Sequence, residues 1–337
     1  MKFSFAQILK YTISFAIAIL IFYYLYKDQD FDQITSLFFK VDYFWIVFSM
    51  FLMILSHWSR AWRWALMLHP FGYNVGISRP FLALMFGYLT NMLLPRIGEI
   101  SRSTMLNRTA NVPINLSFGA VITERVIDLL FMCAIAVVTL FLEFDKLGDF
   151  LLKTFGNGEA LMQKVYVLVG LGFLGLLGLL VLFLLRNKLK KLPLYEKIAV
   201  FLYGLKDGLL SLSKLSKNDQ ILFWLHSVII WVLYYFTSYV LFFCIPETAD
   251  LGFMCGLSIL VMTAISIAAP VQGGIGVYHV FVAATFTAYG VESGLGKDFA
   301  FLMHSVQTFL IVTAGAISFL ISMFLKPKKH ENSPQNI

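Results

Sequence analysis

The stretch that decides the fold is Asn91-Met92-Leu93-Leu94-Pro95-Arg96-Ile97-Gly98-Glu99-Ile100-Ser101-Arg102. It places two arginines, a glutamate, a proline and a glycine inside an otherwise apolar region. Broken, polar backbone is costly in hydrocarbon and is tolerated only where protein buries it or where it lines a wet cavity. An uncharged counterpart follows at Ala269-Pro270-Val271-Gln272-Gly273-Gly274-Ile275-Gly276-Val277-Tyr278-His279. A pair of such interruptions points to a transport site.

The surrounding composition is that of a polytopic membrane protein. Of its 337 residues 59% are hydrophobic and only 13% are charged, and the mean hydropathy is +0.79. A soluble domain carries about 25% charged residues. The net charge of +7 is distributed by membrane side, so we expect no nucleic-acid partner. Cys133, Cys244 and Cys255 lie in apolar runs without a Cys-x-x-Cys pair and are interpreted as small hydrophobes.

Hydrophobic runs predict the membrane-spanning helices. A helix needs about 20 apolar residues to cross the hydrocarbon core. Residues 8–26 offer no small-residue cleavage site, so they are expected to stay as a first span. Two shorter apolar stretches, 80–94 and 251–269, end in the broken motifs. The predicted full spans are 8–26, 44–68, 118–142, 165–185, 220–243 and 299–325.

The distribution of positive charge predicts the orientation. With the N-terminus in the cytoplasm, most lysines and arginines fall on the cytoplasmic side, as the positive-inside rule requires. Both termini are then cytoplasmic, and neither 80–102 nor 251–290 can cross completely. The two segments become re-entrant hairpins of opposite orientation, which is typical of an inverted repeat. The alternative is that 80–94 and 251–269 are ordinary spans and the span count differs.

We therefore predict an all-α polytopic membrane protein with about six full spans and two re-entrant helical hairpins. A single transmembrane domain covers 1–326, and a polar, disordered cytoplasmic tail covers 327–337. Residues 186–219 have helical apolar spacing, and they form either an amphipathic helix on the membrane surface or a solvated connector. A shorter interfacial helix outside is indicated by Phe31, Ile34, Leu37 and Phe38.

Six charged residues are predicted to form one network. A charge at bilayer depth costs about 2.5–3.5 kcal/mol on insertion scales, so these side chains need partners. Arg96, Glu99 and Arg102 belong to the broken motif. Glu124, Arg125 and Asp128 belong to the following span, where their spacing of three and four residues places them on neighbouring helix faces. Three positive and three negative residues are expected to balance in a neutral network that joins the first hairpin to the following span: Arg96, Glu99, Arg102, Glu124, Arg125 and Asp128.

The network has two interpretations. It could only hold one helix against another, as buried ion pairs can. Alternatively, an arginine keeps unused donors that face a cavity, where its planar fork suits a phosphate. A helix that starts after Pro95 or Gly274 adds backbone N–H groups that also suit an anion. A lipid phosphate is the anion expected at that depth.

The second motif is interpreted through its glycines. Gly273, Gly274 and Gly276 allow a ligand or a neighbouring helix to approach the backbone closely. Gln272 and His279 are the strong polar side chains near the turn. A glycine-rich phosphate cradle and close helix packing both remain open. The candidate lipid-binding residues are Asn91, Arg96, Glu99, Arg102, Glu124, Arg125, Asp128, Gln272, Gly273, Gly274 and His279.

Other polar residues receive structural interpretations. Arg60 and Arg63, with neighbouring tryptophans, are expected to form an aromatic and basic belt at the cytoplasmic surface. His226 is expected at the interface, and His304 and Gln307 are expected to make interhelical contacts. The spacing of His, Glu and Ser residues suggests no metal site, cofactor or catalytic residue.

The motifs resemble those of a flippase-like integral membrane family that includes the transmembrane region of lysylphosphatidylglycerol synthase, the multiple peptide resistance factor. The resemblance covers residues 10–325 and rests on three ordered elements. They are Asn91 with Leu94-Pro95-Arg96-Ile97-Gly98-Glu99 and Arg102, then Glu124-Arg125 with Asp128, then Pro270 with Gly273-Gly274-Ile275-Gly276. It implies a bacterial or archaeal inner-membrane protein that handles a phospholipid or a polyprenyl-phosphate lipid.

Two departures affect what the resemblance implies. The chain ends soon after Lys329, where the best-known member continues into a soluble aminoacyltransferase domain, so an enzymatic role is not expected. His279 stands where the family habit is an acidic residue. The leading hypothesis is a lipid translocator. The alternatives are a membrane-bound lipid-modifying transferase and a non-transporting scaffold that binds envelope-biogenesis proteins.

Overall fold

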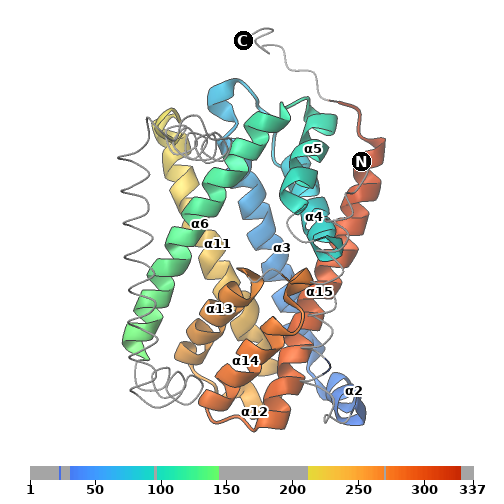
Figure 1. Ribbon diagram of the computed structural model, residues 1–337, viewed down its shortest axis with the longest axis vertical. Coiled ribbons are helices and arrows are strands. Elements are labelled where there is room, and N and C mark those ends of the chain that lie inside the picture. Colours follow the sequence, from blue (N-terminus) through green and yellow to red (C-terminus); the bar gives the residue numbers. More distant parts are fainter. Residues whose placement is uncertain (1–22, 24–30, 95–96, 144–211, 269–270, 328–337) are drawn as a thin grey trace, which may run out of the picture.

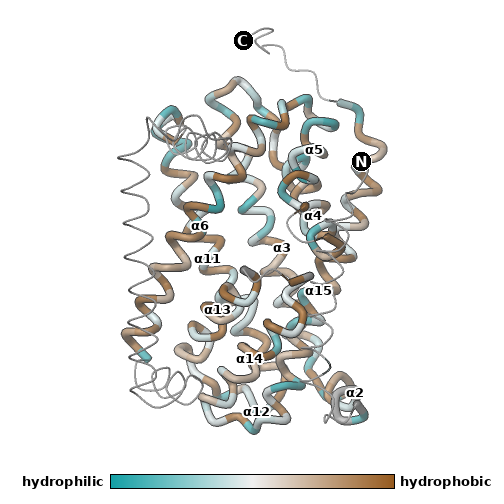
Figure 2. The backbone as a smooth tube through the Cα atoms, viewed as in Figure 1, coloured by the Kyte–Doolittle hydropathy of each residue, from teal (hydrophilic) through white to brown (hydrophobic). Residues whose placement is uncertain are grey.

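Four helices of the computed structural model are long and apolar enough to cross a membrane. The structure describes residues 23, 31–94, 97–143, 212–268 and 271–327. The long helices are α3 (Tyr43–Leu66), α6 (Ile114–Leu142), α11 (Lys217–Tyr239) and α15 (Ser293–Phe324). They confirm the helices predicted at 44–68, 118–142, 220–243 and 299–325, whereas 8–26 and 165–185 lie outside the described residues. Figure 2 shows hydrophobic residues along most of α6 and α15.

Shorter helices complete the described part of the chain, which contains no strand. Helix α2 coincides with the predicted interfacial helix. Most of the segment 186–219 and the tail 328–337 lie outside the described residues. The shorter elements are α2 (Phe31–Lys40), η1 (His69–Phe71), α4 (Ser78–Leu93), α5 (Gly98–Ala110), η2 (Val240–Cys244), α12 (Pro246–Ala249), α13 (Phe253–Ala268), η3 (Gln272–Gly274) and α14 (Val277–Ala288).

Four of the shorter helices form two helical hairpins. Helix α4 packs against α5, and α13 packs against α14. The four helices have 16, 13, 16 and 12 residues, fewer than the roughly 20 that a full crossing needs. The hairpins point toward each other from opposite ends of the molecule, α4 and α5 from the top and α13 and α14 from the bottom (Figure 1). Their tips meet where α4 contacts η3.

Glycine brings α4 and α5 together. An added Cβ on Gly87 would lie 2.8 Å from the Gly98 carbonyl oxygen and 3.0 Å from Arg102 Cβ. A Cβ on Gly98 would collide with the Gly87 carbonyl oxygen and with the Asn91 side chain. The first hairpin is therefore closed by small residues, as is usual where helices pack closely in membranes.

Each hairpin has its own apolar core. One core lies around the first hairpin and includes Trp64, Leu106 and Val121. The other lies around the second hairpin and includes Phe242, Phe286 and Phe299, together with Cys244 and Cys255. These two cysteines pack as small hydrophobic residues, as predicted.

Candidate functional site

The charged network begins on α3, where the sequence placed a surface belt. Arg60 and Arg63 are 3% and 0% exposed, so their expected position at the membrane surface is wrong. Arg63 Nη2 donates to Asp128 Oδ1 at 2.7 Å, and Arg60 Nη2 lies 2.9 Å from Asp128 Oδ2. The two arginines are three residues apart, so both reach α6 from one face of α3. Buried guanidinium groups can take this position because each of them forms an ion pair with Asp128 there.

Helix α11 holds the same face of α3. Arg63 Nη1 donates to Ser227 Oγ at 3.1 Å. His226 is 8% exposed, and its Nδ1 lies 2.7 Å from Ser59 Oγ. His226 is thus buried between α3 and α11, and its expected position at the membrane interface stays a prediction. These contacts fix α3 against both long neighbours.

The network continues into the first hairpin through Arg102. Its Nη2 donates to Glu124 Oε2 at 2.7 Å, and both side chains are almost completely buried. Glu124 Oε1 also lies 3.8 Å from Arg63 Nε, so the carboxylate is shared between two arginines. The Arg102 guanidinium stacks over the Trp64 ring with 4.8 Å from Cζ to the centroid. The predicted link between the hairpin and the following span is confirmed for this pair.

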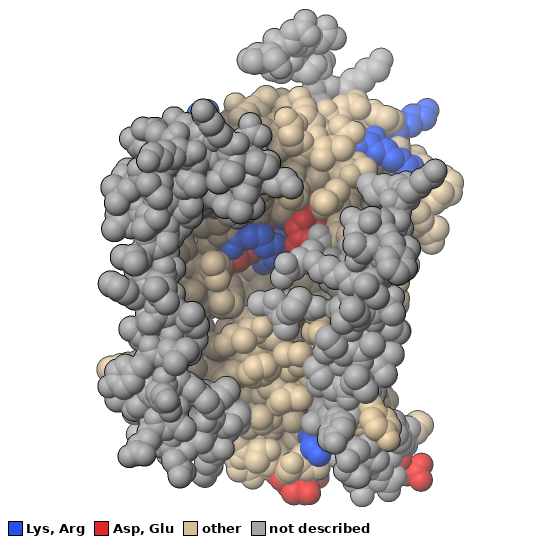
Figure 3. All heavy atoms as spheres, viewed as in Figure 1, with Lys and Arg blue, Asp and Glu red and all other residues tan. Residues whose placement is uncertain are grey.

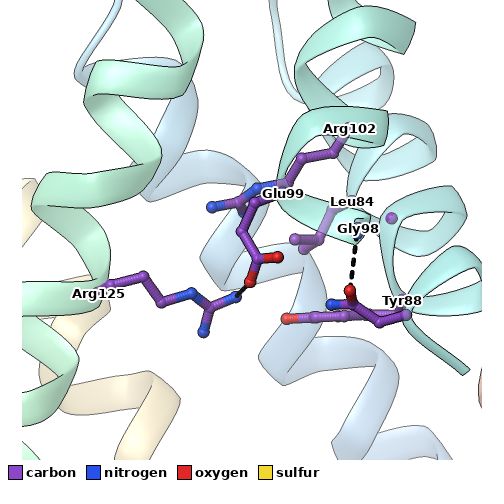
Figure 4. A pocket seen from close by; sticks show the side chains of 8 residues that line it. Leu84, Tyr88, Gly98, Glu99, Arg102 and Arg125 are labelled. Carbon is purple, nitrogen blue, oxygen red and sulfur yellow. Dashed lines mark hydrogen bonds and ion pairs between the residues drawn. The ribbon is translucent and has the colours of Figure 1, made fainter. Parts of the chain in front are cut away.

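A second ion pair stands at the edge of the network. Arg125 Nη2 lies 3.3 Å from Glu99 Oε1, and the two side chains are 42% and 25% exposed. Figure 4 shows Arg125 on α6 reaching across to Glu99 on α5, above Tyr88. Both residues line a narrow crevice with Leu84, Gly87, Tyr88, Asn91, Gly98 and Arg102. Figure 3 shows blue and red atoms of charged residues near the middle of a largely uncharged face.

Several hydrogen-bonding atoms of the network are buried without a partner among the described residues. They include Arg102 Nε and Nη1 and Glu99 Oε2. Buried polar atoms are almost always hydrogen-bonded, so exceptions call for an explanation such as a missing ligand. Arg102 uses one of its three nitrogens for Glu124 and leaves the other two unused. The crevice is closed around these atoms and has no space for a water molecule, so a bound group reaches the donors only when the crevice opens.

The described network is positively charged. It contains four arginines, Arg60, Arg63, Arg102 and Arg125, and three acids, Glu99, Glu124 and Asp128. The prediction of an internally balanced set is wrong among these residues, because α3 supplies two arginines that it did not include. Arg96 lies outside the described residues. An excess cation at a buried site favours an anionic ligand.

Asn91 has a capping role in this structure. Its Oδ1 accepts a hydrogen bond of 2.7 Å from the backbone N–H of Gly98, the first residue of α5. The first N–H groups of a helix have no partner within the helix, so this contact satisfies one of them. The same contact crosses the turn of the first hairpin, because Asn91 belongs to α4. Asn91 lines the crevice and shapes its floor.

The second hairpin contributes a neutral turn. Gly273, Gly274 and Gly276 have φ angles of 58°, 72° and 82°, which strain any residue with a side chain. A Cβ on Gly273 would lie 3.5 Å from Met92 Cε, so this glycine faces the tip of the first hairpin. Conformation therefore explains these three glycines, in addition to close packing at Gly273. Gln272 belongs to η3, and the structure does not describe its side chain.

Histidines fix this turn. His279 Nδ1 accepts from the Gly276 N–H at 3.3 Å and caps α14. His304 on α15 donates from Nε2 to the Gly273 carbonyl oxygen at 2.9 Å, and Gln307 Nε2 donates to the Tyr278 hydroxyl at 3.4 Å. The predicted interhelical contacts of His304 and Gln307 are confirmed. His279 packs against His304 with ring centroids 4.7 Å apart.

One sequence pattern could have identified Arg60 and Arg63 as members of the buried network. Arg60 and Arg63 occur at the end of an apolar run and are three residues apart, so they are spaced to share a helix face. The described cations of the predicted network were not available to Asp128, because Arg102 pairs with Glu124 and Arg125 pairs with Glu99. Within the described residues, no group of His, Cys, Asp and Glu could hold a metal ion.

Comparison with known proteins identifies the family. Residues 11–315 match the lysylphosphatidylglycerol synthase TM region. The chain is also similar to a UPF0104 membrane protein of Methanocaldococcus jannaschii, with 24% identity over 199 residues. That alignment covers 58% of this chain and 55% of the relative, so the chain spans about half the length of the curated relative it matches. No solved structure matches the chain. The chain belongs to the lysylphosphatidylglycerol synthase TM-region family, which confirms the resemblance of its motifs.

Proposed function

We propose that the protein moves a phosphate-bearing lipid across the cytoplasmic membrane of a bacterium or archaeon. The crevice between α4, α5 and α6 binds the lipid phosphate, with Arg102 and Arg125 as its donors. Arg96, which lies between α4 and α5 in the sequence, is proposed as a third. The lipid is a phospholipid or a polyprenyl phosphate, in keeping with a family whose description names a phospholipid.

One observation carries this proposal: Arg102 lines the crevice and keeps buried hydrogen-bond donors without partners among the described residues. Arg102 is 2% exposed and keeps Nε and Nη1 without partners among the described residues. A monoanionic phosphodiester would bring the described charges to balance. An arginine fork and a phosphate also match in geometry, and charge-assisted hydrogen bonds of this kind are among the strongest in proteins.

The proposal includes the membrane arrangement. The first hairpin enters and leaves from the cytoplasmic side, and the second enters and leaves from outside. Both termini are cytoplasmic. This arrangement follows from the charge distribution of the loops and from the short lengths of α4, α5, α13 and α14. The tips would then meet near the bilayer centre, where inverted-repeat transporters bind their substrates.

Opposed hairpins offer a physical route for alternating access. The described contact between the tips is apolar on the α4 side, at Met92, and backbone on the η3 side, at Gly273. No ion pair among the described residues joins the two hairpins, so they can separate without exposing a charge. The α5 side of the crevice is instead tied to α6 by ion pairs. A lipid headgroup would pass along this boundary while its phosphate stays on the arginines.

Translocation in proteoliposomes tests the proposal. The full chain is reconstituted with phospholipids labelled on an acyl chain, and a membrane-impermeant reductant quenches the label in the outer leaflet. We expect faster loss of the protected signal than in protein-free liposomes, and slower loss with Arg125→Gln. Arg108→Gln is the matched control, because Arg108 is exposed and donates to the Met323 carbonyl oxygen instead. Equal rates with and without protein would overturn the proposal.

A further inference from the structure

The crevice contains unsatisfied atoms of two opposite kinds. Arg102 Nε and Nη1 are buried hydrogen-bond donors, and Glu99 Oε2 is a buried acceptor, all without partners among the described residues. Glu99 and Arg102 are three residues apart on α5, so they stand side by side on one helix face. Both line the same crevice.

These atoms restrict the chemistry of a ligand. A guanidinium N–H can only donate, so it requires an oxygen acceptor such as a phosphodiester. An ionised carboxylate oxygen can only accept, so it requires an N–H or O–H group. A ligand that satisfies both carries a phosphodiester and a hydrogen-bond donor. These two groups are no farther apart than neighbouring residues on one helix face.

We propose that the crevice selects phospholipids whose headgroup carries a hydrogen-bond donor next to the phosphodiester, and that Glu99 accepts from this donor. The inference rests on the proposed function and names the substrate class of the same site. Ethanolamine and glycerol headgroups share this chemistry, through an ammonium and a hydroxyl group. A choline headgroup has the positive charge but no N–H, and a methyl headgroup has neither.

The pair Glu99–Arg125 explains how such a ligand enters. Its one contact of 3.3 Å is longer than the 2.7 Å contacts inside the network, and both side chains are partly exposed. A headgroup offers each member of the pair a replacement partner, the phosphodiester for Arg125 and the donor for Glu99. Opening the pair therefore leaves neither charge alone, and it gives the phosphodiester access to the buried Arg102.

A headgroup comparison tests the selection. Four acyl-labelled lipids, with ethanolamine, glycerol, choline or methyl headgroups, are compared in the proteoliposome assay. We expect the first two to move about tenfold faster than the last two, as the loss of one hydrogen bond to a charged group predicts. A faster ethanolamine lipid identifies an ammonium as the preferred donor, and a faster glycerol lipid identifies a hydroxyl group. Equal rates for all four headgroups would overturn the inference while the proposed function stands.

Substitution of Glu99 separates its role from a structural one. Glu99→Gln is expected to abolish the difference in transport rate between the ethanolamine and choline lipids. Glu143→Gln is the matched control, because Glu143 accepts from the Tyr289 hydroxyl at the other end of α6. Retained selectivity in Glu99→Gln would contradict the role assigned to Glu99.

A binding measurement keeps the inference testable if no lipid moves. Short-chain lipids with the same four headgroups are added to the purified protein in detergent, and the unfolding temperature is recorded. We expect the ethanolamine or glycerol lipid to raise it and the choline and methyl lipids to leave it unchanged, with no difference in Glu99→Gln. Absent transport combined with this pattern refutes the translocator function alone. An equal rise in the unfolding temperature with all four headgroups refutes the proposed headgroup selection.

Discussion

Arg63 Nη2 and Asp128 Oδ1 lie 2.7 Å apart in the interior of the protein, and this contact joins α3 to α6. Arg60 approaches the other oxygen of the same carboxylate at 2.9 Å. One acid therefore holds two buried cations from a helix 65 residues away in sequence. The relationship separates the network into a buried, structural part on α3 and an accessible part at Glu99 and Arg125.

Removal of the shared carboxylate should destabilise the fold strongly. Asp128→Asn leaves Arg60 and Arg63 without a counter-charge, and breaking a buried pair by removing one partner costs about 3–5 kcal/mol. The free energy of unfolding in detergent measures the loss. Asp219→Asn is the control, since its contact with His69 is 3.4 Å long and partly exposed, and about 1 kcal/mol or less is expected. Equal losses in the two variants would contradict the structural role.

Neutralisation of Arg125, at the edge of the charged network, should slow lipid transport and leave the stability of the fold nearly unchanged. Arg125→Gln removes a partly exposed ion pair, which contributes about 1 kcal/mol or less to folding. A charge-assisted hydrogen bond to a phosphate is worth about 1.5–3 kcal/mol, so lipid translocation should fall about tenfold or more. Translocation rate and unfolding free energy are measured on the same preparation. A large stability loss with unchanged transport would reverse the assigned roles of the two parts of the network.

A methyl group between α4 and α5 should be poorly tolerated. Gly98→Ala places a Cβ against the Gly87 carbonyl oxygen and the Asn91 side chain, and such overpacking costs about 1–3 kcal/mol. Gly119→Ala on α6 is the control, because its Cβ would have nothing within 4 Å, and alanine favours a helix by about 1 kcal/mol. Thermal unfolding should therefore shift in opposite directions. A neutral Gly98→Ala would show that the two helices can separate freely.

A link between the hairpin tips should stop transport. In a background without the three native cysteines, Met92→Cys and Gly273→Cys place thiols at the contact between α4 and η3. A short bifunctional thiol reagent is expected to join them and to abolish translocation, and each single variant should stay active after treatment. Gel mobility after proteolysis reports the link. Full transport by the linked protein would exclude separation of the tips as a required step.

Labelling from the two membrane sides tests the proposed orientation. Asn74→Cys and Asn111→Cys flank the first hairpin at exposed positions, and Gly252→Cys and Glu292→Cys flank the second. We expect an impermeant thiol reagent to label the first two only from the cytoplasmic side and the last two only from outside. If Asn74→Cys and Asn111→Cys are labelled from different sides, the first hairpin crosses the membrane completely.

The sequence predicted the fold where local composition decides it. Long apolar runs produced α3, α6, α11 and α15, and the interruption at 91–102 produced the turn of the first hairpin. Charge depth and spacing also predicted that Glu124 pairs with the hairpin, through Arg102. These inferences depend only on the free-energy cost of placing polar groups in hydrocarbon, which is a property of each residue type.

The sequence could not predict which polar and charged residues contact one another. Arg60 and Arg63 stand in a tryptophan-rich run and match a surface belt as well as a buried pair, and only the packing of α3 against α6 decides between them. Asn91 likewise matches a ligand contact or a helix cap. The capping role depends on the close approach of α4 and α5 that Gly87 and Gly98 permit.

By itself the sequence determined a membrane protein with two broken, oppositely placed segments and a charge cluster beside the first. The tertiary structure alone decided the balance of that cluster, because two arginines arrive from a helix that the motif does not include. Ion pairing depends on distance in space and on burial, and neither is set by separation along the chain. The excess positive charge, which arises where Arg60 and Arg63 share Asp128, is thus a property of how the helices pack.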